Sequence, residues 1–156
     1  MNNRYICKAK RKDNNEWIEG VAIFADNKAF ILNNAKVEFI KGFNKNRLIF
    51  VLVEVIPETV GQCTTLTDKN GKLIFTGDIL HIKTGKGWAC PAGTDIYYEV
   101  FFTEFNEQCD ECTEYIGFMA GNINDDEYSI QYLVCDYGAE VVGNVYDNPE
   151  LLEVKR

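Results

Sequence analysis

The 156-residue sequence predicts an all-β (mainly β) protein with at most one or two short helical turns. Many short segments carry β-branched, aliphatic or aromatic residues, and glycine- or asparagine-containing turns separate them. Such spacing is typical of a barrel or a barrel-like sheet. With 46% hydrophobic residues, including ten Phe and eight Tyr, the chain has enough apolar surface to form a folded core.

The first third of the chain predicts strands joined by polar turns. An N-terminal hairpin is expected because the cluster Asp13–Asn15 separates two strand-like runs. The run Leu48–Ile56 is long and apolar, which is typical of a buried strand, and Pro57 ends it. Residues Pro57–Leu66 are more polar and predict a connection. The other strands expected here are Arg4–Lys10, Trp17–Phe24, and the short pair Ala29–Leu32 and Val37–Ile40 on either side of Asn33 and Asn34.

The segment Leu66–Leu80 gives the strongest local prediction. Asn70-Gly71 predicts a type I′ hairpin turn, because both residues tolerate the positive φ that this turn requires. Gly77-Asp78 predicts a second turn or a bulge before the next strand. We expect the aspartates of this segment to cap backbone amides rather than to bind metal.

The remainder of the chain again predicts strands, with two exceptions. Asn106–Thr113 is compatible with a loop or with a helix. The tail Asn148–Val154 predicts a short helical turn capped by Asn148, with Pro149 at its first position. The strands expected in this part are Ile96–Phe105, Tyr115–Ala120, Tyr128–Cys135 and Glu140–Val145.

Charge is distributed unevenly along the chain. Residues 1–50 carry ten Lys or Arg against five Asp or Glu, whereas residues 51–156 carry six against nineteen. Between Gly87 and Val154 there are fifteen acidic residues and no Lys or Arg. A negative field of this kind repels phosphate backbones, so we expect no non-specific nucleic-acid binding by this half. It is typical either of a solvated surface or of one that meets a basic partner.

Nothing in the sequence predicts a catalytic site or a cofactor. The only histidine, His81, lies in an alternating segment, where a surface or hydrogen-bonded strand residue is expected. Thr84–Gly87 lacks the spacing of a phosphate-binding loop and predicts a hairpin tip. Cys109 and Cys112 have the spacing of two zinc ligands, but no second closely spaced pair accompanies them, so no metal site is expected. The six cysteines predict free thiols.

Ordered blocks along the chain resemble the YopX family of bacteriophage and prophage proteins. The blocks, in order, are Val55–Gln62, Leu66–Lys72, Gly77–Ile79 and Val142–Leu152, and an N-terminal turn before Trp17 and Gly20 also fits. Cys63 and Thr65 depart from the pattern, because an aromatic residue and a glycine usually stand there. The shared residues are Gln62, Leu66, Asp68, Asn70, Gly71, Gly77, Asp78, Gly143, Asn144, Asn148 and Pro149.

The resemblance implies an SH3-like barrel with additional N-terminal hairpin strands. We therefore expect a single domain over residues 1–156, in which the strands of residues 1–56 pack on a barrel core of residues 57–156. It implies no catalytic residues, and the shared positions are those that turns and packing require.

The functional expectation is a non-enzymatic phage or prophage accessory protein that binds a host or phage protein. Self-association into a homo-oligomer fits the opposed charges of the two halves. The alternative is a nucleic-acid-linked role, either through Lys8, Lys10, Arg11 and Lys12 or through acidic charge mimicry. A metal-dependent hydrolase that uses clustered carboxylates is a third, weaker alternative. No export signal and no apolar run of membrane-spanning length are present, so we expect the protein in the bacterial host cytoplasm and not in a membrane.

Overall fold

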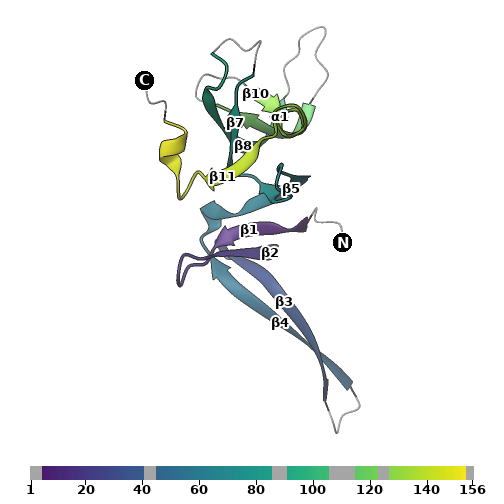
Figure 1. The fold of residues 1–156 in the computed structure, drawn as a ribbon. Coiled ribbons are helices and arrows are strands. Elements are labelled where there is room, and N and C mark those ends of the chain that lie inside the picture. The colour runs from purple at the N-terminus through teal and green to yellow at the C-terminus, as the bar shows by residue number, and fades with distance from the viewer. Residues whose placement is uncertain (1–4, 41–44, 86–90, 106–114, 123–126, 154–156) are drawn as a thin grey trace. The chain divides into compact units, whose positions relative to one another are not determined.

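The computed structural model describes residues 5–40, 45–85, 91–105, 115–122 and 127–153 (Figure 1). The side chains of residues 34–48 and 104–116 lie outside this description. The chain forms two compact units, Met1–Cys63 and Thr64–Arg156. Both consist mainly of antiparallel strands, which confirms the predicted mainly-β class. The packing of residues 1–56 on residues 57–156 stays a prediction, as does the single domain.

The first unit is an antiparallel meander. The N-terminal hairpin predicted around Asp13–Asn15 is confirmed. After the last long strand, β5 (Gly61–Thr67) begins where the predicted connection was placed, so that prediction was wrong for most of Pro57–Leu66. Only the short 3-10 turn η2 (Pro57–Thr59) precedes it. The strands of the meander, in the order of their pairing, are β1 (Cys7–Lys10), β2 (Trp17–Ala25), β3 (Lys28–Ile40) and β4 (Lys45–Val55).

Strand β3 is one long strand, not the two short strands predicted on either side of Asn33 and Asn34. The pairing register of β3 with β4 shifts between Leu32 and Asn34. The strand therefore accommodates one extra residue as a bulge-like irregularity and continues without a turn. The turn that begins β3 lies earlier, at Asp26 and Asn27, whose φ values are 50° and 61°. Two central residues with positive φ define the type I′ hairpin loop.

The sheet of the first unit curls until the ends of β1 and β4 meet. Arg11 and Val55 form an isolated antiparallel bridge, and the Ile56 amide donates to the Lys10 carbonyl at 2.9 Å. The face inside this curl is the core, where Ala9, Ala29, Ile31 and Val55 are fully buried. The strands that the structure describes do not form the closed barrel that the resemblance implied.

The second unit contains an antiparallel sheet of five strands in the order β10-β9-β8-β7-β11. The predicted strands Ile96–Phe105, Tyr115–Ala120 and Glu140–Val145 are confirmed. Buried Leu80, Ile82, Tyr98 and Val100 form the centre of its core. The strands of this unit are β6 (Leu73–Phe75), β7 (Asp78–Lys83), β8 (Asp95–Phe105), β9 (Tyr115–Gly121), β10 (Glu127–Ser129) and β11 (Glu140–Asn144).

A helix, α1 (Ile130–Tyr137), replaces most of the predicted strand Tyr128–Cys135, so that prediction was wrong. The Ser129 side chain accepts a hydrogen bond from the Tyr132 amide and caps the start of the helix. Gly138 ends it with φ of 61°, the left-handed conformation that helix ends favour. Ile130 and Leu133, three residues apart, are its buried residues.

The C-terminal tail forms the predicted turn, the 3-10 helix η3 (Pro149–Leu151), with Pro149 at its first position. In this described segment Asn148 makes no side-chain capping bond to the turn, so the predicted cap was wrong. The segment Asn106–Thr113 and the tip of the Thr84–Gly87 turn lie outside the described residues.

Thr65 carries backbone strain that a substitution can test. Its φ is 68°, a conformation that costs roughly 1–2 kcal/mol for a residue with a Cβ. Thr65→Gly is therefore expected to raise the free energy of unfolding by about 1 kcal/mol, after the entropy cost of glycine. Urea denaturation measures this change. Thr67→Gly, in the same strand but without positive φ, is the matched control and is expected to lower stability. A loss of stability in Thr65→Gly would contradict the prediction.

Candidate functional site

Two blocks of residues shared with the YopX pattern lie next to each other in the structure. About seventy positions separate these two blocks in the sequence. The segment from Asp68 to Asp78 runs alongside β11 and the turn that follows it. At one end, Asp68 bonds the amide of Val141, and at the other Asp78 lies opposite Asn144. The two blocks recognised in the sequence are therefore neighbouring parts of one structure.

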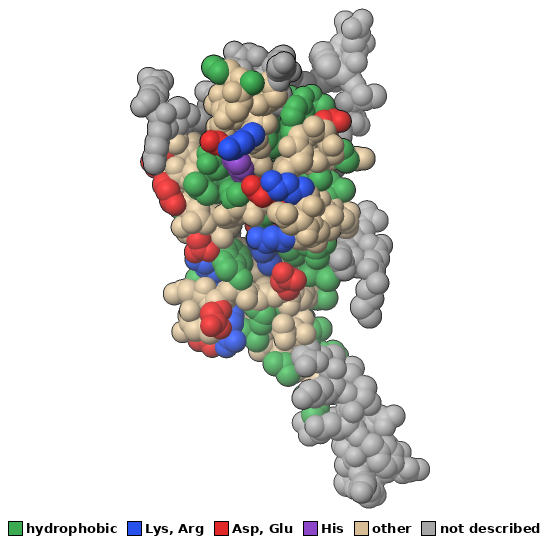
Figure 2. Space-filling model, viewed as in Figure 1, with side chains coloured by type: hydrophobic (Ala, Val, Ile, Leu, Met, Phe, Trp, Pro, Cys, Tyr) green, Lys and Arg blue, Asp and Glu red, His purple; other side chains and the backbone are tan. Residues whose placement is uncertain are grey.

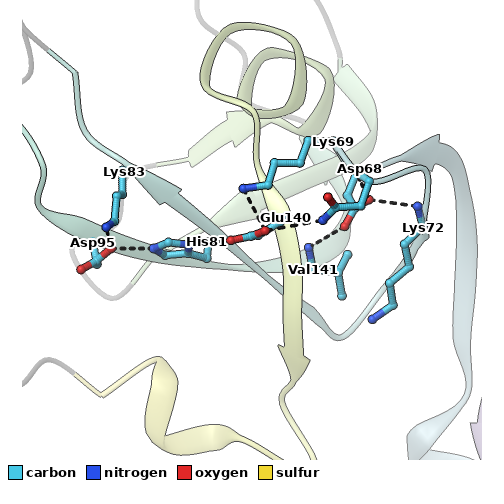
Figure 3. Close-up of polar contacts among 9 residues, drawn as sticks. Asp68, Lys69, Lys72, His81, Lys83, Asp95, Glu140 and Val141 are labelled. Atoms are coloured by element: carbon cyan, nitrogen blue, oxygen red, sulfur yellow. Dashed lines mark hydrogen bonds and ion pairs between the residues drawn. The ribbon is translucent and has the colours of Figure 1, made fainter.

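Asp68 organises the loop that contains Asn70 and Gly71 (Figure 3). It is 5% exposed, and its Oδ1 accepts from the amides of Asn70 at 2.8 Å and Lys72 at 2.9 Å. Its Oδ2 accepts from the Val141 amide at 3.0 Å. Burial alone would raise the pKa of this carboxyl, but the three amides outweigh it and the pKa is lowered. The predicted role in capping backbone amides is confirmed.

The loop itself differs from the predicted type I′ turn. Gly71 has φ of 81°, but Asn70 is not among the described residues with positive φ. Asp68 and Lys72 close a loop of three residues, in which the Gly71 amide bonds the Asp68 carbonyl at 3.0 Å. A three-residue loop that ends in a left-handed glycine is the next common hairpin connection. The side-chain acceptor of Asp68 stabilises this form, a contribution that the Asn-Gly pair alone does not reveal.

The second turn of the segment is equally structural. Gly77 has φ of 81°; its amide donates to the Val100 carbonyl, and its carbonyl accepts from the Val145 amide. Asp78 is 1% exposed and accepts from the Phe75 amide at 2.9 Å. This confirms the predicted turn at Gly77-Asp78.

The C-terminal block is held in the same way. Asn144 accepts from the amides of Tyr146 and Asp147, each at 3.0 Å, and its carbonyl accepts from Asn148. A Cβ on Gly143 would lie 2.9 Å from the Asn148 side-chain carbon Cγ, so a larger residue here would displace the Asn148 side chain. Of the remaining shared residues, Gln62 pairs with Cys7 in the first unit, and Leu66 packs on the core of the second.

His81 lies between two carboxylates at the surface of the second unit, as the purple side chain in Figure 2 shows. Its Nε2 is 2.7 Å from Asp95 Oδ1, and its Nδ1 is 3.4 Å from Glu140 Oε1. Lys69 also pairs with Glu140 at 2.8 Å, and these contacts lower the pKa of that carboxyl (Figure 3). The expectation of a hydrogen-bonded strand histidine is confirmed. The side chains of this cluster connect neighbouring strands and loops through polar contacts.

Three of the six cysteines fall within the described residues, and all three are free thiols. Cys7 is half-buried, Cys63 is buried and Cys135 is exposed. Burial raises the pKa of the Cys7 thiol, which favours the unreactive protonated form. Cys90, Cys109 and Cys112 lie outside the described residues, and the absence of a metal site at Cys109 and Cys112 stays a prediction. Within the described ranges, no cluster of His, Cys, Asp and Glu is suited to a metal ion.

A cavity of about 370 Å³ lies in the half of the chain that lacks Lys and Arg. Glu99 and Glu127 line it together with the apolar Phe101 and Leu152. Burial raises the pKa of Glu99, because the charged form loses contact with water. The acidic lining is unsuited to phosphate-containing ligands.

The four basic residues of the N-terminal hairpin make two kinds of contact. Lys8 and Lys10 place their ammonium groups 5.0 and 5.6 Å from the centre of the Trp17 ring. Arg11 pairs with Asp13 at 2.6 Å. Lys12 pairs with Glu54 at 2.7 Å. Arg11 and Lys12 are therefore each matched by a carboxylate.

An apolar patch lies on the outside of the first unit, opposite its buried core. We call it the outer face and define it by Val21, Ile23, Phe30, Leu32 and Leu52. The pairing register places Val21, Leu32 and Leu52 in one row across three strands, and Ile23 and Phe30 in the next. Val21 is 45% exposed and Leu52 is 50% exposed.

The outer face corrects a prediction about β4. The run Leu48–Ile56 was expected to be a buried strand, but in its described part only Val55 is fully buried. Phe50, Val51 and Leu52 are all about half exposed. An apolar run does not reveal which of its residues another layer covers, because that depends on what packs against each face.

These features define a mainly-β protein whose most recognisable residues build turns and whose first unit exposes an apolar sheet face. A family model described as YopX protein matches residues 7–153. The chain therefore belongs to the YopX family.

Protein EF1440 from Enterococcus faecalis has a similar crystal structure. The TM-score is 0.60 at 22% identity, over 94% of this chain and 96% of that chain. At this identity the similarity shows the fold. A search of curated proteins gave no match. Among the described residues, no helix is long and apolar enough to cross a membrane.

Proposed function

We propose that the chain is a non-enzymatic phage or prophage accessory protein that binds another protein through the outer face. This proposal rests on the row of Val21, Leu32 and Leu52 across three strands. Ile23 and Phe30 lie beside this row, and the face that carries them is turned away from the core. Contiguous apolar patches are uncommon on soluble proteins and mark sites of interaction.

The energetics favour a protein partner. Removing apolar surface from water is worth about 25 cal/mol per Å², so a few half-exposed aliphatic side chains supply several kcal/mol when a partner covers them. A rigid sheet presents these side chains with little ordering cost. The non-enzymatic part of the proposal is supported by the contacts of the polar groups, since Asp68 and Asp78 hold backbone amides and His81 contacts two carboxylates.

The nucleic-acid alternative retains one supporting observation, the two lysines beside Trp17. Aromatic rings next to basic side chains bind single-stranded nucleic acid by stacking and charge. Arg11 and Lys12, the other half of the predicted basic patch, are paired with Asp13 and Glu54. A protein partner therefore accounts for more of the surface.

Affinity capture with matched variants tests the proposal. Tagged wild-type protein and the double variant Val21→Ser, Leu52→Ser are incubated with lysate of infected or lysogenic bacteria. We expect a set of proteins that the double variant recovers at least about tenfold less, because each lost apolar contact costs about 1 kcal/mol. Val51→Ser is the control, since Val51 is 44% exposed on the same strand but points to the opposite face. Equal recovery by wild type and double variant would contradict the proposal.

A further inference from the structure

The cavity of about 370 Å³ lies on the face of the five-stranded sheet that is turned away from the core of the second unit. Tyr98 and Ala120 are fully buried in that core. Because side chains alternate along a strand, their neighbours Glu99 and Gly121, which line the cavity, belong to the opposite face. All the lining residues lie in the second unit, so none of them belongs to the outer face.

The pairing register explains why a hollow forms at this point. Glu99, Gly121 and Glu127 lie in one row across β8, β9 and β10. The glycine in the middle of the row has no side chain to fill the space above the sheet. A Cβ there would lie 3.0 Å from the Phe101 ring atom Cε1 and 3.6 Å from Cγ of Glu127. The floor of the cavity is therefore a glycine, with an aromatic ring and two carboxylates around it.

The lining combines apolar surface with negative charge. Phe101 and Leu152 supply the apolar part. Glu99, Glu127 and Glu153 supply three carboxylates, and in the part of the chain that the structure describes their side chains have no hydrogen bond and no ion pair. Burial raises the pKa of Glu99, and no neighbouring cation among the described residues lowers it. The charge that lines the cavity thus has no internal partner among these residues.

A ligand that suits this lining carries both positive charge and apolar surface. Anions are repelled by the three carboxylates, and a neutral apolar ligand would cover Glu99 without giving it a partner. An ammonium group gains charge-assisted hydrogen bonds from carboxylates and is attracted to an aromatic ring. No cluster of the described His, Cys, Asp and Glu residues suits a metal ion, which favours an organic cation.

We propose that this cavity binds a small organic cation, a primary ammonium group carried on an apolar stem. The ammonium group lies between Glu99 and Glu127, and the stem packs against Phe101 and Leu152. The volume is at the lower end of the range for ligand pockets, about 300–1,000 Å³, which fits a short amine. This site is independent of the proposed function, because it shares no residue with the outer face.

Calorimetric titration of the intact protein with three probes of equal length tests the charge requirement. The probes are hexylamine, 1-hexanol and hexanoate, at about pH 7.5, where alkylamines are protonated and carboxyl groups are ionised. We expect hexylamine to bind with a Kd of about 1 mM or below. Hexanol should bind at least about tenfold more weakly, and hexanoate should not bind. Hexanol binding as tightly as hexylamine, or no hexylamine binding at about 10 mM, would overturn the inference.

Matched variants locate the binding. Glu99→Gln with Glu127→Gln keeps the shape of both side chains and should weaken hexylamine binding at least about tenfold. Glu150→Gln is the control for net charge, because Glu150 is exposed on η3 and does not line the cavity. Thermal unfolding establishes that each variant is folded. In nuclear magnetic resonance spectra, hexylamine should shift the Gly121 amide signal of the wild type and of Glu150→Gln. Unchanged affinity in the double Gln variant would refute the assignment.

Two sources of the ammonium group are separated by one more probe, the blocked tripeptide Gly-Lys-Gly. Competition between this tripeptide and hexylamine would support the site and assign it to a lysine side chain of another protein. Binding of hexylamine alone would support the site and assign it to a free amine. Hexylamine binding that appears only in the variant Lys155→Gln, Arg156→Gln would assign the cavity to the chain's own basic residues and would overturn the inference.

Discussion

Replacing Asp68 with alanine is expected to destabilise the second unit by about 3–4 kcal/mol. The substitution removes three hydrogen bonds from a nearly buried carboxylate to the amides of Asn70, Lys72 and Val141. Bonds to a charged group contribute about 1.5–3 kcal/mol each, and water can replace part of the loss at the exposed loop residues. The effect is large because one side chain both shapes the loop and ties it to β11.

Urea unfolding of Asp68→Ala and Asp68→Asn measures this contribution. Asn keeps one acceptor oxygen and should lose less stability than Ala. Asp136→Ala, at an exposed position on α1 in the same unit, is the control and should change stability by less than about 0.5 kcal/mol. A loss of less than about 1 kcal/mol in Asp68→Ala would contradict the role of this carboxylate.

The same carboxylate predicts a dependence on pH. Its pKa is lower in the folded protein than in the unfolded chain, where an aspartate has a pKa of about 3.9. The stability that it contributes is therefore complete above that pH and is lost as the pH falls through the folded value. Between about pH 4 and pH 2, the unfolding free energy of the wild type should fall more steeply than that of Asp68→Asn. Equal slopes would contradict the assignment.

Gly20→Ala is expected to destabilise the first unit by about 3 kcal/mol. A Cβ at this position in β2 would contact the backbone carbonyl of Leu32 and would lie 2.7 Å from the Ile31 side-chain atom Cγ2. The Leu32 carbonyl belongs to a paired strand and cannot move without disturbing the register of β3. Overpacking a dense interior costs about 1–3 kcal/mol, and the cost is at the upper end when the neighbour is backbone.

Thermal and urea unfolding of Gly20→Ala measure this effect. Gly85→Ala is the matched control, because a Cβ there has no heavy atom within 4 Å and Gly85 does not have positive φ. The control should be neutral or slightly stabilising, since alanine restricts the unfolded chain. A Gly20→Ala protein as stable as the control would show that β2 and β3 can separate without cost.

Most of the strands could be predicted because their apolar and polar residues alternate, or because they form β-branched runs with turn residues at both ends. The hairpin at the N-terminus and the strands β8, β9 and β11 are examples. Helix α1 could not be predicted, because Tyr128–Cys135 is short and rich in residues that suit a strand. What decides its structure is the cap at Ser129, the left-handed Gly138 and the burial of Ile130 and Leu133.

The candidate site could be predicted from the sequence less well than the fold. The basic cluster Lys8–Lys12 was visible as a run of charges, but the pairing of Lys12 with Glu54 is a contact between residues far apart in the chain. The outer face gave no separate signal, because its residues come from three strands and meet only when those strands pair. Alternation predicts that two faces exist, and only packing shows which one is covered.

The sequence by itself determined that this is an acidic, mainly-β protein of the YopX pattern and where most of its turns lie. It did so because turn geometry depends on residues such as Gly71, Gly77 and Asp68, whose backbone freedom or short acceptor side chain acts locally. The tertiary structure decided that Asp68 holds β11, that β3 is continuous through Asn33 and Asn34, and that the apolar β4 contributes to an exposed face. These are outcomes of pairing and packing between distant segments, which no local pattern of residues fixes.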